Sequence, residues 1–265
     1  MKRNRLVCGG EPWRAWAAWI GLTASAGIAA AGRPLTVDDA DPVAPGAVEI
    51  EAGVEHSRDS GARLWTLSWA LAAGIVPRLE AGASMGGHFE ERIHRGDDGT
   101  SSSDHVHGVG DLTLGLKWLT LAGGPLGFRH ALVPSVKLPT ADDDHEIGSG
   151  EVDGDLHWVA SRSLGERLGL HLTLGYLWIG GDEPDVVHGG AALDFLWTDT
   201  VQIVAETFAE RERADGATTV VGSRAGVRLL ASEALALDAA VAAGWSGDIP
   251  DWSATVGLTW TFGVR

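Results

Sequence analysis

The chain has 265 residues, of which 45% are hydrophobic and 21% are charged, and this composition excludes disorder over its whole length. The 20 lysines and arginines stand against 36 aspartates and glutamates, and the resulting net charge of −16 argues against nucleic acid as a partner, because phosphates need a basic surface. No uninterrupted apolar run reaches the roughly 18 residues that a membrane-spanning helix requires.

Residues 1–31 have the features of a secretory signal peptide. A basic start precedes an apolar stretch over residues 15–28, and alanines at 29–31 offer a cleavage site before Gly32. The alternative is a buried N-terminal helix. Cys8 is the only cysteine and precedes the apolar stretch, so neither a lipid anchor nor an internal disulfide is expected. Cleavage would remove a net charge of +3 from −16 and leave a cysteine-free chain of −19.

Residues 32–45 form a short segment rich in aspartate and proline, which we expect on the periplasmic side. A flexible tail is the preferred interpretation, and a plug that folds into the following domain is the alternative. Residues 46–265 make up that domain.

Beyond this segment, apolar residues recur with a period of two, which predicts strands and not helices. Near the end of the chain, for example, Val256, Leu258 and Trp260 alternate with glycine and threonine. The predicted strands are about 10–12 residues long, the length that a tilted transmembrane strand needs. The twelve expected ranges are 46–56, 63–74, 79–90, 109–118, 129–139, 153–162, 168–179, 187–197, 201–210, 219–229, 235–245 and 253–262.

The connections between these strands fall into two sets. One set is mostly tight, as at residues 75–78 and 164–167, whereas the other set is mostly longer and rich in aspartate and glycine, as at 91–108 and 140–152. Short turns at one end and longer loops at the other are typical of outer-membrane barrels. The pattern therefore predicts an all-β, up-and-down antiparallel transmembrane β-barrel of twelve strands.

The polar faces of the strands carry more charge than a soluble core tolerates, so we expect them to line a closed lumen while the apolar faces meet lipid. A soluble β-sandwich fits the alternation equally well, but it explains the strand length and the glycine content less well. The residues expected to line the lumen and the solute path are Glu49, Glu51, Glu55, Asp111, Lys117, Lys137, Asp155, Glu206, Arg224 and Arg228. Tryptophans near strand ends suit an interfacial girdle, and they are Trp118, Trp158, Trp178, Trp197, Trp245 and Trp260.

No sequence motif predicts catalysis or a cofactor. The chain has no G-x-S-x-G, Walker or H-E-x-x-H sequence, and we expect no enzyme activity, no catalytic residue and no metal site. Two clusters could attract cations but are interpreted as solvated loops: His94, His105 and His107 with nearby aspartates, and the run 142–146. Lumen histidines that could serve as a base are His88, His157, His171 and His188.

Three stretches resemble an outer-membrane, transporter-like family linked to meta-pathway phenol degradation. They are residues 33–40 with 46–51, residues 110–118, and residues 134–140 with 148–150. The resemblance spans about residues 33–262 and implies a bacterial outer-membrane β-barrel that admits small aromatic or other apolar compounds. The chain departs from many such barrels because Phe262 is followed by three further residues, which affects recognition by the barrel-assembly machinery.

The sequence thus predicts an outer-membrane channel for passive uptake of small molecules, with lipid, a small solute and the assembly machinery as partners. The basic residues Lys117, Lys137, Arg224 and Arg228 would face Glu49, Glu51, Glu55 and Glu206 and create a transverse field. Loops 91–108 and 140–152 would restrict access. The alternatives are a non-conducting outer-membrane barrel that acts through its loops or as a structural element, and a soluble secreted β-protein.

Overall fold

The structure is a computed structural model that describes residues 32–59, 62–95, 101–141, 148–247 and 249–263. These residues form thirteen strands and one 3-10 turn, η1 (Pro125–Gly127). Among them, no helix has the length and apolar composition needed to cross a membrane. The strands are β1 (Val48–Arg58), β2 (Ala62–Val76), β3 (Leu79–Arg95), β4 (Ser101–Val109), β5 (Leu112–Leu121), β6 (Arg129–Leu138), β7 (Asp153–Leu164), β8 (Leu168–Trp178), β9 (Val186–Leu196), β10 (Val201–Glu212), β11 (Val220–Leu230), β12 (Leu235–Ser246) and β13 (Trp252–Phe262).

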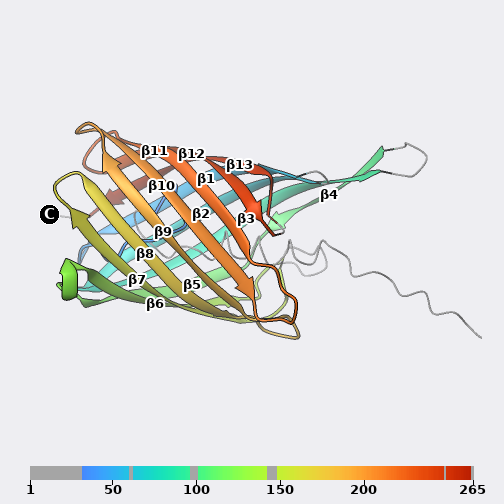
Figure 1. The fold of residues 1–265 in the computed structure, drawn as a ribbon, viewed down its shortest axis with the longest axis horizontal. Helices are drawn as coiled ribbons and strands as arrows, with labels where there is room; N and C mark the ends of the chain where they lie inside the picture. The colour runs from blue at the N-terminus through green and yellow to red at the C-terminus, as the bar shows by residue number, and fades with distance from the viewer. Residues whose placement is uncertain (1–31, 60–61, 96–100, 142–147, 248, 264–265) are drawn as a thin grey trace, which may run out of the picture.

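The strands close into a single antiparallel barrel (Figure 1). Strands that follow one another in sequence pair with each other, except that β5 pairs with β3 and not with β4. The strand β1 pairs with β13 from Val48 opposite Phe262 to Arg58 opposite Trp252. The strands β4 and β5 pair one after the other with β3, so they occupy one position in the wall and the barrel has twelve positions. Closure pairs the backbone groups that an open sheet would leave unsatisfied in lipid. The predicted twelve-stranded barrel is confirmed.

The two ends of the barrel differ, as the sequence predicted. The chain enters β1 and leaves β13 at the same end, where the connections 77–78, 165–167, 197–200 and 231–234 are short. We call this the turn end and the opposite end the loop end. The longest connection at the loop end is 139–152, of which residues 142–147 lie outside the described part.

The expected loop 91–108 is mostly strand. The strand β3 continues to Arg95, and β4 pairs with it from Gly87 opposite Val109 to Arg95 opposite Ser101. This hairpin reaches beyond the rim at the loop end, on the right in Figure 1. The hairpin was not predicted because its serines and charged residues resemble those of a polar loop. The described part of the hairpin extends away from the mouth, so it gives no support to the expected restriction of access by this segment.

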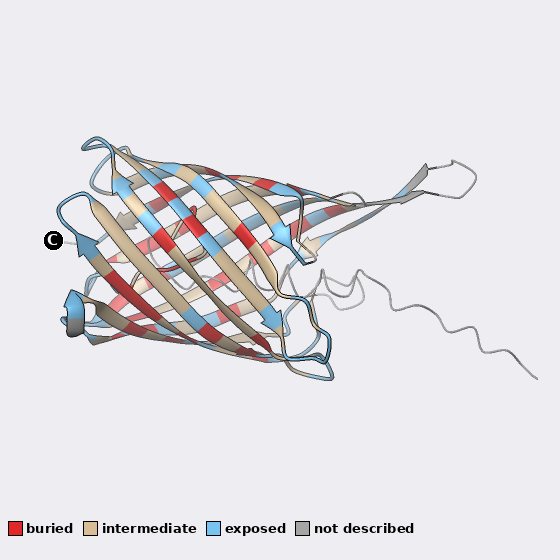
Figure 2. Cartoon of the chain, in the orientation of Figure 1, coloured by how far each residue is buried: buried red, intermediate tan, exposed pale blue. Residues whose placement is uncertain are grey.

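Burial alternates along the strands in the sense opposite to that of a soluble protein (Figure 2). On β13, Val256 and Trp260 are 59% and 51% exposed, whereas Thr255 and Thr259 on the opposite face are buried. On β2, Trp65, Leu67, Trp69 and Leu71 are all exposed. An exposed apolar face this large is stable only in hydrocarbon, and the buried polar face lines the lumen.

Tryptophans gather near both ends of the outward face. Trp118 and Trp260 are exposed near the turn end, and Trp178 and Trp245 are exposed near the loop end. Indole rings prefer the boundary between lipid headgroups and hydrocarbon, so the two levels fit the two interfaces of a bilayer. Trp158 differs from these exposed tryptophans because it is half-buried. Its ring stacks on His130, with the ring centroids 5.5 Å apart.

Candidate functional site

The lumen of the barrel contains residues 32–45, which we call the plug segment. The segment starts near mid-height beside Gly53 of β1, and it descends to the turn end, where Pro45 bridges to Gly74 of β2 before β1 begins. Hydrogen bonds and ion pairs hold it to opposite walls of the barrel, so the preferred expectation of a flexible tail was wrong and the alternative of an internal plug is the observed arrangement.

Arg33 anchors the upper end of the plug segment. Its guanidinium bonds to both oxygens of Asp238 on β12 at 3.1–3.2 Å and to Thr255 Oγ1 on β13 at 3.1 Å. It lies over Gly53 and Gly257, which pair with each other across β1 and β13. A methyl group at either glycine would overlap the guanidinium, so these two positions must lack a side chain for Arg33 to lie there.

Glu206 of β10 holds the middle of the plug segment. Its carboxylate accepts hydrogen bonds from the Thr36 hydroxyl and from the backbone N–H groups of Thr36 and Val37, at 2.8–3.0 Å. Hydrogen bonds of this kind are stronger than neutral ones because the acceptor is ionised. On the neighbouring strand, Arg224 lies between Glu206 at 3.8 Å and Glu55 at 2.9 Å, and it donates to the Pro34 carbonyl at 2.7 Å.

A buried ion pair holds the plug segment closer to the turn end. Lys117 of β5 is fully buried, and its Nζ lies 3.0 and 2.9 Å from the two oxygens of Asp38. Glu80 pairs in register with Lys117 and accepts a hydrogen bond from the Val43 N–H at 2.8 Å. Removing one partner of an ion pair that is buried in this way lowers the free energy of unfolding by about 3–5 kcal/mol, because the other charge is left buried without a partner.

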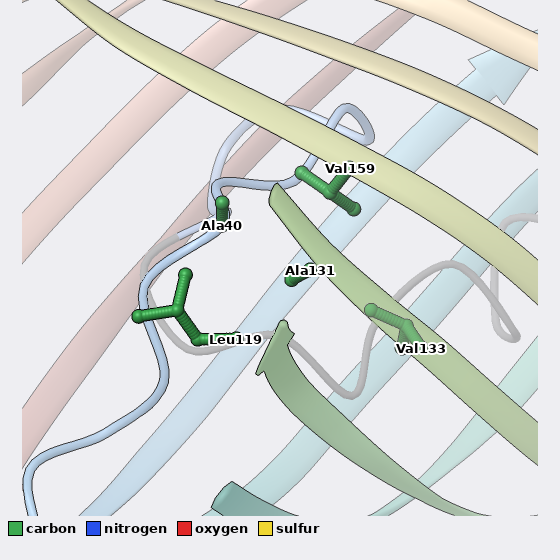
Figure 3. Close-up of a cluster of buried hydrophobic side chains, with 5 residues drawn as sticks. All are labelled: Ala40, Leu119, Ala131, Val133 and Val159. Atoms are coloured by element: carbon green, nitrogen blue, oxygen red, sulfur yellow. The ribbon is translucent and has the colours of Figure 1, made fainter. Parts of the chain in front are cut away.

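Apolar packing completes the contact at the turn end. Ala40 packs with four inward-facing residues of β5, β6 and β7, which Figure 3 shows as Leu119, Ala131, Val133 and Val159. The Ala40 N–H also donates to the Ser161 hydroxyl at 2.8 Å. A small apolar cluster inside a largely polar lumen marks the place where this part of the segment docks.

Asp41 stands at the exit of the segment toward the turn end. Its carboxylate lies 2.7 Å from the Arg129 guanidinium. Partial burial, together with the Asp39 carboxylate, raises the pKa of Asp41, and Arg129 opposes that rise.

A second charged group lies near the loop end. The Nζ of Lys137 is 3.0 Å from Asp111 and 2.8 Å from Asp153, and Asp111 also accepts the N–H groups of Thr140 and Ala141 at 2.9 Å. Asp111 therefore ties the start of the 139–152 connection to the wall.

The remaining predicted lumen residues are spread over the wall. Glu49 accepts from the Thr261 hydroxyl at 2.7 Å, and Glu51 accepts from Thr259 at 3.4 Å, both across the β1–β13 pair. Asp155 contacts His157 and His188. Arg228 bonds to the Arg33 carbonyl.

The lumen wall also holds a hydrogen-bonded series of side chains that was not predicted from the sequence. It consists of Ser161, His171 and Asp194. Ser161 Oγ lies 2.8 Å from His171 Nδ1, and His171 Nε2 lies 3.5 Å from Asp194 Oδ1. The order resembles a hydrolytic triad, but the Ser161 side chain is fully buried beneath Ala40. In this arrangement the Ser161 hydroxyl lies against the plug segment and accepts the hydrogen bond from the Ala40 N–H, while His171 and Asp194 lie behind it on the wall.

The roles of Arg33 and Asp38 were not predicted from the sequence either. The available signal was glycine on the lumen faces at Gly53 and Gly257, because two neighbouring positions without side chains leave room for another group. Of the loop clusters, His105 and His107 lie beside Phe89 on the hairpin, with ring centroids 5.4 and 6.4 Å from it. The run 142–146 and Asp97 and Asp98 lie outside the described residues.

A closed barrel with a lipid-compatible outer face and a polar lumen defines the class as a bacterial outer-membrane β-barrel. Residues 31–262 match the model of the family described as "Putative MetA-pathway of phenol degradation", and the chain belongs to that family. No curated protein matches the sequence.

Solved structures share the fold at low sequence identity. An outer membrane channel from Pseudomonas putida F1 aligns with a TM-score of 0.64 and 15% identity, covering 84% of this chain and 98% of that one. The transport unit of the autotransporter AIDA-I from Escherichia coli gives 0.55 and 9%, covering 94% and 98%. The NanC porin gives 0.54 and 9%, covering 80% and 98%.

Proposed function

We propose that the protein is a passive outer-membrane channel for small molecules, in which the plug segment narrows the path. The main observation that supports this proposal is a cavity between the plug segment and the wall. It is lined by groups that bind polar solutes, among them Glu51, Glu55, Thr66, Ser68 and Arg224. The fold similarity to an outer membrane channel and to a porin supports the same function.

The solute class that we infer is small hydroxylated aromatic compounds. The family description, which refers to phenol degradation, supports this class. The cavity offers carboxylates and hydroxyl groups that can hydrogen-bond a phenolic O–H, together with the Arg33 and Arg224 guanidinium groups, whose planar faces stack on aromatic rings. These groups bind and orient a solute, and the enclosed Ser161 hydroxyl offers no route to hydrolysis. We therefore propose transport and no enzymatic step.

Planar-bilayer recording tests the proposal. Folded protein, verified by heat-modifiable gel mobility, should give discrete single-channel steps. Catechol should interrupt the current more often than cyclohexane-1,2-diol at equal concentration, because the two diols match in size and hydroxyl number and differ in aromaticity. Equal interruption would reject the aromatic solute class. The absence of steps from folded protein would reject the channel and favour the alternative of a non-conducting barrel.

A further inference from the structure

Three lumen side chains with metal-binding atoms converge above the plug segment. Asp155 and His157 project from β7, and His188 projects from β9, with β8 between the two strands. One ligand atom from each residue lies within 4.8 Å of the others. The Asp155 carboxylate accepts a hydrogen bond from each ring, at 2.6 Å from His157 Nδ1 and 2.8 Å from His188 Nε2.

A glycine on the intervening strand makes this convergence possible. Gly175 of β8 pairs in register with His157 on one side and with His188 on the other. A methyl group at Gly175 would overlap both the His188 ring and the Cβ atom of His157. Without it, the two rings approach across β8 with centroids 5.9 Å apart. The wall is therefore shaped to bring two imidazoles and one carboxylate together.

We propose that Asp155, His157 and His188 form a binding site for a divalent transition-metal cation, such as Zn²⁺, on the lumen wall toward the loop end. Two imidazoles and a carboxylate are ligands that such cations prefer to the oxygen-only sets that suit Mg²⁺ or Ca²⁺. The three side chains are only 9–16% exposed, so little side-chain freedom remains to be lost on binding.

Metal binding requires a small rearrangement. Bonds of about 2.0–2.1 Å in a tetrahedral site separate neighbouring ligand atoms by roughly 3.3 Å. The two carboxylate–imidazole separations of 2.6 and 2.8 Å must widen by about 0.5–0.7 Å. The proton that each ring donates to Asp155 moves to the other nitrogen of that ring or is released to water, and metal bonds replace the two hydrogen bonds. The fourth position would face the lumen and accept water or a solute. Glu210, which pairs in register with His188 on β10, places a further carboxyl group on the same side.

Isothermal titration of the detergent-folded protein with Zn²⁺ tests the site without reference to channel activity. We expect saturable binding of one Zn²⁺ and no comparable binding of Mg²⁺. His157→Gln and His188→Gln should each raise the Kd about tenfold or more, because each removes one ligand. His171→Gln is the matched control, since it removes another lumen histidine and leaves the three residues intact.

The exposed hairpin histidines need a second control, because they could bind Zn²⁺ themselves. The double variant His105→Gln/His107→Gln should retain the high-affinity site. Loss of Zn²⁺ binding in that variant, or an unchanged Kd in both folded His157→Gln and folded His188→Gln, would overturn the proposal. Co²⁺ absorption provides a second readout: an intense visible band in the wild type that disappears in His188→Gln supports the assigned ligands, and an identical band in both rejects them.

Discussion

Individual charged residues on the lumen wall accept hydrogen bonds from the backbone of the plug segment. Glu206 accepts two consecutive N–H groups and one hydroxyl, and Glu80 accepts a third N–H further along. The plug segment forms no strand that would satisfy these donors internally. Side-chain carboxylates therefore replace the ladder bonds that a strand would make. This explains why acidic residues lie on lumen faces that also carry buried, apolar contacts.

Glu206→Gln should loosen the plug segment. The amide keeps one acceptor oxygen but replaces the other by a donor, so at least one hydrogen bond to a charged acceptor is lost, at a cost of about 1.5–3 kcal/mol. A thiol reporter at Ala40→Cys, introduced into the expected cysteine-free mature chain, should then react with a soluble thiol reagent about tenfold faster or more.

Glu210→Gln is the matched control, because it makes the same change on the same face of β10, four residues toward the loop end. An equal acceleration in both variants would show that Glu206 has no special part in holding the segment.

At the scale of elements, the plug segment and the β3–β4 hairpin have opposite relations to the lumen. The plug segment contacts the inner face of the barrel on many sides, whereas β4 pairs only with β3 in the described structure. The pathway through the barrel should therefore depend on the first element and not on the second.

Deletion of residues 33–44 should raise the single-channel conductance about twofold or more, because the lower half of the lumen is emptied and its cross-section grows. Shortening the hairpin by removal of residues 93–103 should leave the conductance unchanged. Planar-bilayer recording of both folded variants provides the measurement. If the hairpin deletion changes the conductance and the deletion of residues 33–44 does not, the constriction lies outside the part of the lumen that the plug segment occupies.

At the scale of the whole molecule, the position of a charge relative to the lumen determines how strongly it acts on permeating ions. Glu49 lies on the lumen wall near the turn end, next to Thr261. Glu166 lies in the exposed 165–167 turn, outside the lumen. Low-dielectric walls focus the field of a charge inside a passage, so the lumen carboxylate should influence permeating ions more strongly than the exposed one.

Glu49→Gln should therefore lower the ratio of cation to anion permeability, by a factor on the order of two. The reversal potential in a KCl gradient measures this ratio. Glu166→Gln changes the net charge by the same amount and should leave the reversal potential where it is. Identical potentials for Glu49→Gln and the wild type would remove this residue from the ion path.

The wall of the barrel could be predicted from the sequence, and its contents could not. Period-two alternation located the strands because lipid and lumen impose opposite demands on successive residues, and β13 shows this clearly in Val256 and Thr255. The extension of β3 was not predicted because residues 90–95 are almost all polar and lack the period-two alternation of apolar and polar types. Contacts such as Arg33 to Asp238 join residues 205 positions apart, and no local pattern encodes them.

Arg33 has one more structural consequence, which concerns assembly. A cylinder built from one chain must finally join its first and last strands, here β1 and β13, and Arg33 crosses that join at Gly53 and Gly257. It holds Thr255 of β13 and Asp238 of β12 while it remains covalently linked to β1. Arg33 therefore links the two strands that close the barrel, and we expect closure of the barrel and docking of the plug segment to be cooperative.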